Sequence, residues 1–144
     1  MATTNVYLTF NGNCEEAFLF YKEVFEREFT YIGKFKDMPA NDECEVDPEI
    51  AEKIMHVCLP ISTETMLMGS DATEQSGEVV FGNNFAISIN AESKEDADTY
   101  FLKLSKNGTI QMPMQHTFWG AYFGMFTDKF GINWMVNFDE EEGV

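Results

Sequence analysis

The sequence predicts an α+β fold in which a strand–helix–strand–strand–strand unit occurs twice. The first observation is an alternation of apolar and polar residues at positions 6–10, followed by apolar residues at helical spacing as far as Phe25. The second is that both patterns recur 80 residues further along, at positions 85–90 and 93–104. A duplicated unit is the simplest explanation of this recurrence.

Each predicted helix begins at a residue suited to cap it. Asn13 precedes the first helix and is followed three residues later by Glu16, and Ser93 and Asp96 have the same spacing before the second helix. Both pairs match a capping box. In this motif the side chain of the capping residue accepts a hydrogen bond from the backbone N–H three residues later, and the side chain of that later residue accepts one from the backbone N–H of the capping residue. Asn107 and Gly108 then supply a stop for the second helix.

Residues that suit three short strands follow each helix. In the first unit these are residues 28–36, 54–61 and 65–70, and in the second 109–117, 120–127 and 132–138. The length of 144 residues is enough for one ordinary hydrophobic core. We therefore expect a single domain over residues 1–144, with unit one at about 4–71 and unit two at about 84–138.

Two acidic segments fit neither copy of the unit. Residues 37–53 contain Pro39 and Pro48 among many carboxylates and are expected to form a surface loop, with one helical turn near residues 48–53. Residues 139–142 form an acidic tail, which we interpret as a solvated end.

Charge and cysteine content exclude several classes of function. The formal charge of -16 disfavours nucleic acids and anionic membranes as partners. No apolar run is long enough to span a bilayer, and the N-terminus lacks the pattern of a signal peptide. Three cysteines without CxxC spacing indicate reduced thiols. We expect a cytoplasmic protein.

The most informative motif lies in residues 115–134, which read Gln-x-Thr-Phe-Trp, then Phe-Gly, then Asp-x-Phe-Gly-x-x-Trp. Together with Phe20-Tyr21 and Met68-Gly69-Ser70-Asp71, this order resembles the PhnB-like branch of the vicinal-oxygen-chelate superfamily, the group of glyoxalases, bleomycin-resistance proteins and extradiol dioxygenases. The resemblance implies a single glyoxalase/bleomycin-resistance-like domain, in which both units share one curved mixed sheet around a cleft with the helices outside. It also implies a homodimer.

The resemblance further implies four positions for the ligands of a divalent metal, usually His or Glu. In this sequence they fall on Asn5 or Tyr7, on Ser70 or Asp71, on Asn84 and on Met135. Asp71 alone is a good ligand for a hard or borderline metal. We therefore expect no metal and no cofactor, and glyoxalase or dioxygenase activity is not carried over. Some members of the branch are labelled demethylubiquinone methyltransferases, but no GxGxG follows the first predicted strand here.

His56 and Asp71 form the candidate catalytic pair. If a turn at Ser62 and Thr63 joins two strands, residues whose numbers sum to about 125–127 face each other, and His56 lies beside Gly69, Ser70 or Asp71. A carboxylate beside an imidazole can fix its tautomer and make it a general base. A rim histidine with no chemical role is the alternative.

Strand parity assigns other residues to the cleft, because side chains alternate between the two faces of a strand. On this basis Gln115 is preferred to His116, which shares a face with Met112 and Met114. Trp119 precedes Gly120, where an indole can close over a bound molecule. Parity also puts Tyr7 and Asn84 in the cleft, whereas Met135 comes from the positions that the resemblance assigns. The expected ligand-binding residues are Tyr7, Met68, Asn84, Gln115, Trp119 and Met135, with Asp71 beside them.

Three functions remain open from the sequence. The leading hypothesis is metal-independent binding of a small, partly aromatic molecule in this cleft. The second is an enzyme that uses His56 and Asp71 for proton transfer, with or without a divalent ion at Asp71. The third is a role in protein interaction through the acidic residues 37–53. Cys58 shares a face with His56, which admits a soft-metal site, but Cys44-x11-His-x-Cys matches no zinc spacing.

Overall fold

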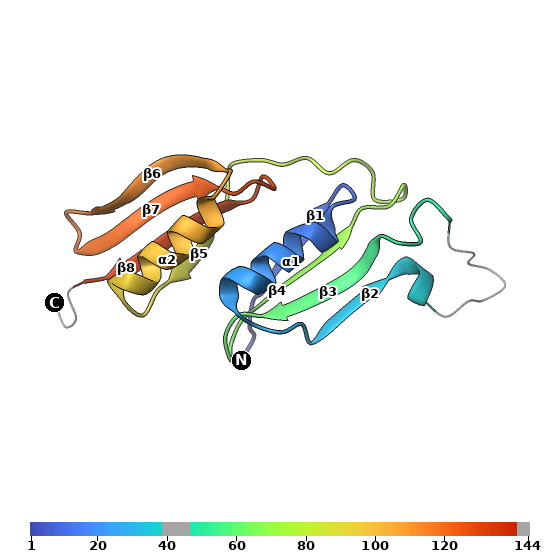
Figure 1. The fold of residues 1–144 in the computed structure, drawn as a ribbon, viewed down its shortest axis with the longest axis horizontal. Helices are drawn as coiled ribbons and strands as arrows, with labels where there is room; N and C mark the ends of the chain where they lie inside the picture. Colours follow the sequence, from blue (N-terminus) through green and yellow to red (C-terminus); the bar gives the residue numbers. More distant parts are fainter. Residues whose placement is uncertain (39–46, 141–144) are drawn as a thin grey trace. The chain divides into compact units, whose positions relative to one another are not determined.

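The computed structural model describes residues 1–38 and 47–140 and divides into two compact units, Met1–Val80 and Phe81–Val144. The elements of unit 1 are β1 (Val6–Phe10), α1 (Cys14–Phe25), β2 (Tyr31–Lys34), the short 3-10 helix η1 (Phe35–Asp37), β3 (Ile54–Pro60) and β4 (Met66–Asp71). Its strands form one sheet in the order β1-β4-β3-β2 (Figure 1).

Unit 2 repeats the same topology. Its elements are β5 (Ile87–Asn90), α2 (Lys94–Ser105), β6 (Thr109–His116), β7 (Ala121–Thr127) and β8 (Asn133–Asp139). The sheet order is β5-β8-β7-β6, which matches the order in unit 1 strand for strand. In both units the first strand pairs in parallel with the last, and the other pairs are antiparallel. The predicted α+β class and the β-α-β-β-β repeat are confirmed, with the strands in two four-stranded sheets.

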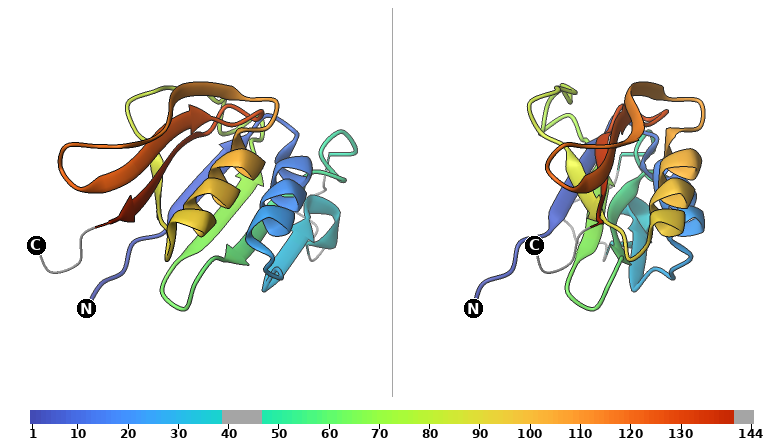
Figure 2. Two further views of the ribbon diagram at one scale, coloured as in Figure 1. Left: turned by 60° about the vertical axis from the view of Figure 1, so that its left-hand side comes forward. Right: turned by 90° about the vertical axis from the view of Figure 1, so that its left-hand side faces the viewer.

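In each unit the helix packs on one face of its own sheet (Figures 1 and 2). In unit 1 that face buries Leu8 and Phe10 of β1 against Phe18 of α1. Gly69 of β4 lies under the helix, and a Cβ there would come within 2.7 Å of the Phe18 ring and 2.8 Å of the Leu8 carbonyl oxygen. Glycine is therefore required for α1 to approach the sheet this closely.

The core of unit 2 is built around Trp134 and Val136 of β8, which are almost fully buried. Phe101 of α2 packs edge-on against Phe126 of β7, with ring centroids 5.1 Å apart. Such an edge-to-face pair adds about 0.5–1.5 kcal/mol to the burial of the two rings. The alternate residues of each strand are thereby left on the face away from the helix.

The two helices begin 80 residues apart, as the repeat predicts, but their N-termini are capped differently. Ser93 accepts a hydrogen bond from Asp96 N at 3.0 Å, which confirms that cap. Asn13 makes no side-chain cap bond, so the predicted capping box with Glu16 is wrong. Its place is taken by Asp71 from the end of β4, which accepts from the backbone N–H of Cys14.

Most of the acidic insert at residues 37–53 lies in positions 39–46, outside the described residues. Instead of a helical turn, residues 47–53 form hydrogen-bonded turns, with Ile50 N donating to Asp47 O and Lys53 N to Ile50 O. Of the acidic tail, residues 141 and 142 also lie outside the described residues. Within the described ranges, no helix is both long and apolar enough to cross a membrane.

Candidate functional site

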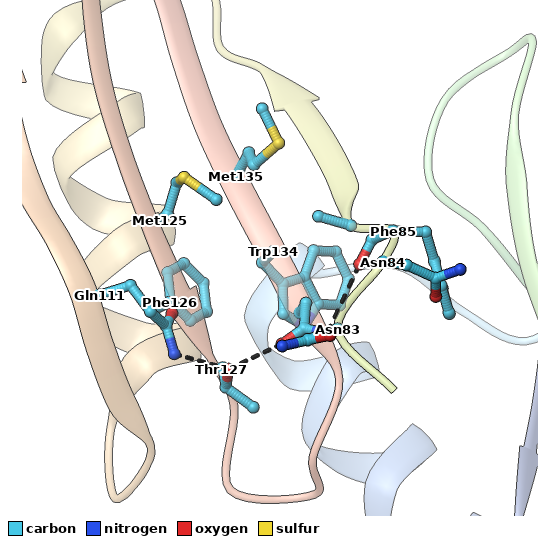
Figure 3. A pocket seen from close by; sticks show the side chains of 11 residues that line it. Asn83, Asn84, Phe85, Gln111, Met125, Phe126, Thr127, Trp134 and Met135 are labelled. Carbon is cyan, nitrogen blue, oxygen red and sulfur yellow. Dashed lines mark hydrogen bonds between the residues drawn. The ribbon is translucent and has the colours of Figure 1, made fainter. Parts of the chain in front are cut away.

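A pocket of about 470 Å³ lies on the face of the unit 2 sheet that α2 does not cover (Figure 3). The orientation follows from Gly124, whose Cβ position would lie 2.8 Å from Phe101 of α2, so that Met125 beside it points the other way. The lining comes from β6, β7, β8 and the segment before β5: Asn83, Asn84, Phe85, Ala86, Gln111, Met125, Phe126, Thr127, Asn133, Trp134 and Met135.

A chain of hydrogen bonds crosses one side of this pocket. Gln111 Nε2 donates to Thr127 Oγ1 at 2.9 Å, and Thr127 Oγ1 donates to Asn133 Oδ1 at 2.7 Å. Asn133 Nδ2 in turn donates to the carbonyl oxygens of Gly82 at 2.9 Å and Phe85 at 3.4 Å. The chain joins three strands to the segment before β5, and it fixes which end of each amide faces its neighbours.

The opposite side of the pocket is apolar. Met125 and Met135 are direct partners in the β7–β8 ladder, and their side chains line the cavity together (Figure 3). Thioether side chains are flexible and polarisable, so they adapt to the shape of an apolar ligand. No lining residue carries a charge.

Two of the predicted ligand-binding residues, Asn84 and Met135, line this pocket. Gln115 and Trp119 do not. Gln115 is exposed on β6 opposite Phe123, and the Trp119 ring lies 6.1 Å from the Phe123 ring while 59% of its surface is exposed. Gln115 and Trp119 therefore lie beside Phe123, near the turn that joins β6 to β7.

His116 lies on the face of β6 that parity predicts, but it is exposed at the end of the strand and is not a buried core group. The β6–β7 register shifts twice between Ile110 and Gln115, and the two shifts cancel, so Ile110 and His116 pair with Phe126 and Tyr122, which share one face of β7. His116 is exposed and its Nδ1 lies 2.5 Å from Glu140 Oε1. Its ring also lies 5.0 Å from that of Tyr122.

The open face of the unit 1 sheet carries Tyr7, Met68 and His56. Tyr7 and Met68 are direct partners in the β1–β4 ladder. The His56 ring stacks on Tyr7 at 5.8 Å and lies 5.9 Å from Tyr31, and Tyr7 Oη and His56 Nδ1 are hydrogen-bonded at 3.4 Å. His56 is thus flanked by two phenol rings.

Asp71 has a different position from the one predicted. The expected register is confirmed, since Val57 pairs with Gly69, but Asp71 shares the parity of Gly69 and faces α1, whereas His56 lies on the opposite face. The Asp71 side chain is buried and its two oxygens accept from the backbone N–H groups of Gly12, Cys14 and Ile54 at 2.9–3.0 Å. The structure does not bring Asp71 to His56. A proton-transfer role for either residue stays a prediction.

Two groups have strongly shifted pKa values. Burial, with the nearby charge of Asp71, raises the pKa of the Cys14 thiol far above its ordinary range, which keeps that thiol protonated. The hydrogen bond from Tyr122 Oη to Asp98 Oδ1, at 2.6 Å, raises the pKa of Tyr122 to about 12, with burial as a lesser cause. Both groups lie on the helix side of their sheets and act in packing.

The positions that the resemblance assigns to a divalent metal do not fit one. Asn5 Oδ1 accepts from Met66 N, and both oxygens of Asp71 are engaged by backbone N–H groups. Tyr7, Asn84 and Met135 supply no ligand that Zn²⁺ or Fe²⁺ binds strongly. Among residues 1–38 and 47–140, a close group of three acidic, His or Cys side chains occurs at Asp47, Glu49 and Glu74, all exposed.

Sequence reasoning missed most of the polar side of the pocket, namely Gln111, Thr127 and Asn133. Thr127 and Asn133 each stand two residues from a methionine that faces the pocket, so parity alone could have placed them. Parity along residues 109–117 also puts Gln111 on the same face as Gln115, so Gln111 could have been included with the predicted cleft residues.

Comparison with known proteins gives the family. The family model described as 3-demethylubiquinone-9 3-methyltransferase matches residues 2–137. The chain belongs to this family. Protein YjdN of Escherichia coli (strain K12) is 35% identical over 137 residues, which are 91% of each chain.

Solved structures agree with this assignment. Protein PA1353 from Pseudomonas aeruginosa is 36% identical and superposes with a TM-score of 0.83 over 98% of this chain and 100% of its own. A PhnB protein from Bacillus cereus is 23% identical, with a TM-score of 0.74 over 95% and 99%. A glyoxylase/bleomycin resistance protein/dioxygenase domain from Frankia shares the fold, at 14% identity and a TM-score of 0.64 over 100% and 95%. The chain thus has the fold of these PhnB and glyoxylase/bleomycin resistance/dioxygenase structures.

Proposed function

We propose that this protein binds a small, uncharged, partly apolar molecule in the unit 2 pocket, and that binding needs no metal ion. The observation that carries the proposal is the lining: a cavity of about 470 Å³ with two methionine side chains, a row of amide and hydroxyl groups, and no charged residue. Cavities of this size hold metabolite- and drug-sized ligands.

The uncharged lining is informative in a chain whose formal charge is -16. An anionic ligand would be repelled by the protein as a whole and would meet no cationic partner among the lining residues. Gln111, Thr127 and Asn133 provide donors and acceptors for an amide, carbonyl or hydroxyl group. Met125 and Met135 would cover an aromatic or branched apolar part of the same ligand.

Thr127 is the residue through which the proposal is tested, because it makes the two hydrogen bonds at the centre of the polar chain. Isothermal titration with acetanilide, benzamide and benzyl alcohol should show saturable binding to the wild-type protein. Thr127→Val keeps the shape of the side chain and removes its hydroxyl, so it should weaken binding of the amides about tenfold, as expected when about 1.4 kcal/mol of polar contact is lost. Binding should persist after dialysis against EDTA.

Thr9→Val is the matched control, since Thr9 is a half-buried strand threonine on the corresponding face of unit 1. It should leave fragment binding unchanged. Equal binding by wild type and Thr127→Val, or binding that EDTA abolishes, would contradict the proposal.

A second candidate, proton transfer by His56, is favoured by one observation. The Tyr7 hydroxyl is hydrogen-bonded to His56 Nδ1, so the imidazole has a partner for orientation even though Asp71 faces α1. The same titration, followed by NMR, separates the two candidates. Fragments that shift the His56 ring signals and leave the Met125 and Met135 methyl signals unmoved would favour His56.

A further inference from the structure

A group of sulfur atoms lies on the open face of the unit 1 sheet. The thiol of Cys58 on β3 donates to Met66 Sδ on β4, and the two sulfur atoms are 3.2 Å apart. Met68 is the direct partner of Cys58 in the β3–β4 ladder, so its side chain leaves the sheet on the same face. His56 stands two residues before Cys58 and shares that face.

We propose that Cys58, Met66 and Met68 form a binding site for Cu(I). Thiolate and thioether sulfurs are soft ligands that select Cu(I) over the harder divalent ions. On binding, the Cu(I)–sulfur bond replaces the S–H bond of Cys58 and the proton leaves to solvent, so no electron is transferred and no co-reactant is needed. The thioethers donate lone pairs and lose nothing.

The geometry suits a shared ion. Two sulfur atoms already in contact need only small side-chain rotations to hold one cation between them, and the unbranched methionine side chains allow such rotations. Cys58 is 9% exposed and Met66 is half-buried, so the site is shielded from bulk water but reachable from the open face. The negative charge of the whole chain favours the arrival of a cation.

The same donor set disfavours zinc. A stable Zn²⁺ site usually needs four ligands drawn from thiolates, imidazoles and carboxylates. In the part of the chain that the structure describes, Cys58 belongs to no group of three such side chains. A site with one thiolate and two thioethers therefore suits a soft monovalent ion better than Zn²⁺.

The test is a competition for Cu(I) between the intact protein and bicinchoninate under anaerobic, reducing conditions, read from the colour of the bicinchoninate complex. Wild type should remove a single Cu(I) ion per chain. Cys58→Ser should remove none. Met66→Leu keeps the thiol and the side-chain volume, and should weaken binding about tenfold, or about 1.4 kcal/mol, because one sulfur ligand is lost.

Three matched variants control for sulfur elsewhere in the chain. Cys14→Ser and Cys44→Ser remove the other thiols, and Met135→Leu removes a thioether of unit 2, so all three should bind Cu(I) as wild type does. Circular dichroism checks that Cys58→Ser is folded. The proposal is overturned if the wild-type protein takes no Cu(I), or if Cys58→Ser binds Cu(I) as tightly as wild type. It is also overturned if Met66→Leu binds Cu(I) as tightly as wild type, because the contact between Cys58 and Met66 would then serve packing alone. None of these results depends on the unit 2 pocket.

Discussion

Units 1 and 2 have the same strand order and helices of equal length, yet the open faces of their sheets differ in chemistry. The face in unit 1 carries an imidazole, two phenols, a thiol and two thioethers. The face in unit 2 carries amides, a hydroxyl and two thioethers around a cavity. The helix-facing residues are mostly apolar in both units, so the two copies agree in their cores and differ on their open faces.

The buried aspartates of the two units show a second difference. Asp71 joins the end of β4 to the start of α1 and to Ile54 of β3, which are distant in sequence. Asp128 acts locally: it accepts from Phe130 N and Ile132 N in the turn before β8, and from the Trp134 indole at the start of β8. Unit 1 therefore depends on one carboxylate for the start of its helix, whereas unit 2 uses the nearby Ser93.

The largest expected effect on stability comes from replacing Asp71, the cap of α1, with the replacement of Ser93, the cap of α2, as the comparison. Asp71→Asn should lower the free energy of unfolding by about 3 kcal/mol, because three backbone N–H groups compete for a single remaining acceptor oxygen and a new N–H₂ is placed among donors. Ser93→Ala should cost only about 1 kcal/mol, the usual value for a lost N-cap. Urea unfolding of both variants gives the two values.

Equal losses in the two variants would contradict this difference between the units. A loss larger for Ser93→Ala than for Asp71→Asn would reverse it, and would mean that the long-range carboxylate is replaced by water at little cost.

A smaller effect is expected at the contact between sheet and helix in unit 2. Tyr122→Phe removes the hydrogen bond to Asp98 and should cost about 1 kcal/mol at neutral pH. That bond raises the pKa of Tyr122 from 10.0 to about 12, so the folded state holds this proton more tightly than the unfolded state. Its stabilisation is complete below pH 10 and is lost as the pH rises through 12.

The measurement is urea unfolding of wild type and Tyr122→Phe at a series of pH values from neutral upward. The difference between the two proteins should shrink between pH 10 and pH 12. A difference that is constant, or that widens with pH, would show that Tyr122 is not held protonated by Asp98.

Most of the fold could be predicted from the sequence, because periodicity records which residues are buried. The ranges of the helices, the β3–β4 register and the Ser93 cap all follow from local patterns and are confirmed. The cap of α1 did not follow, since Asp71 and Cys14 are 57 residues apart and no local pattern links them. Asn13 has the right residue type for a cap, but a better acceptor arrives from the sheet.

Less of the candidate site could be predicted. Asn84 and Met135 both line the pocket of unit 2. Met135 comes from the family resemblance, and Asn84 lies before β5, so parity along these strands does not account for both.

The two register shifts in β6 cancel, so Gln115 keeps its predicted parity, but it is not among the residues that line the pocket. Pro113 stands between the two shifts, and a proline inside a strand is one signal of a bulge. The polar chain from Gln111 to Asn133 joins neighbouring strands and is visible only when these are paired.

The most direct test of the division between the two faces is a methyl NMR spectrum of protein labelled at the methionine methyl groups, assigned with single Met→Leu variants. Acetanilide should shift the signals of Met125 and Met135 and leave Met66 unmoved, since the pocket is on unit 2. Silver(I), a redox-inert substitute for Cu(I), should shift Met66 and Met68 and leave Met125 and Met135 unmoved. Acetanilide signals confined to Met66 and Met68, or no response to either probe, would contradict the account.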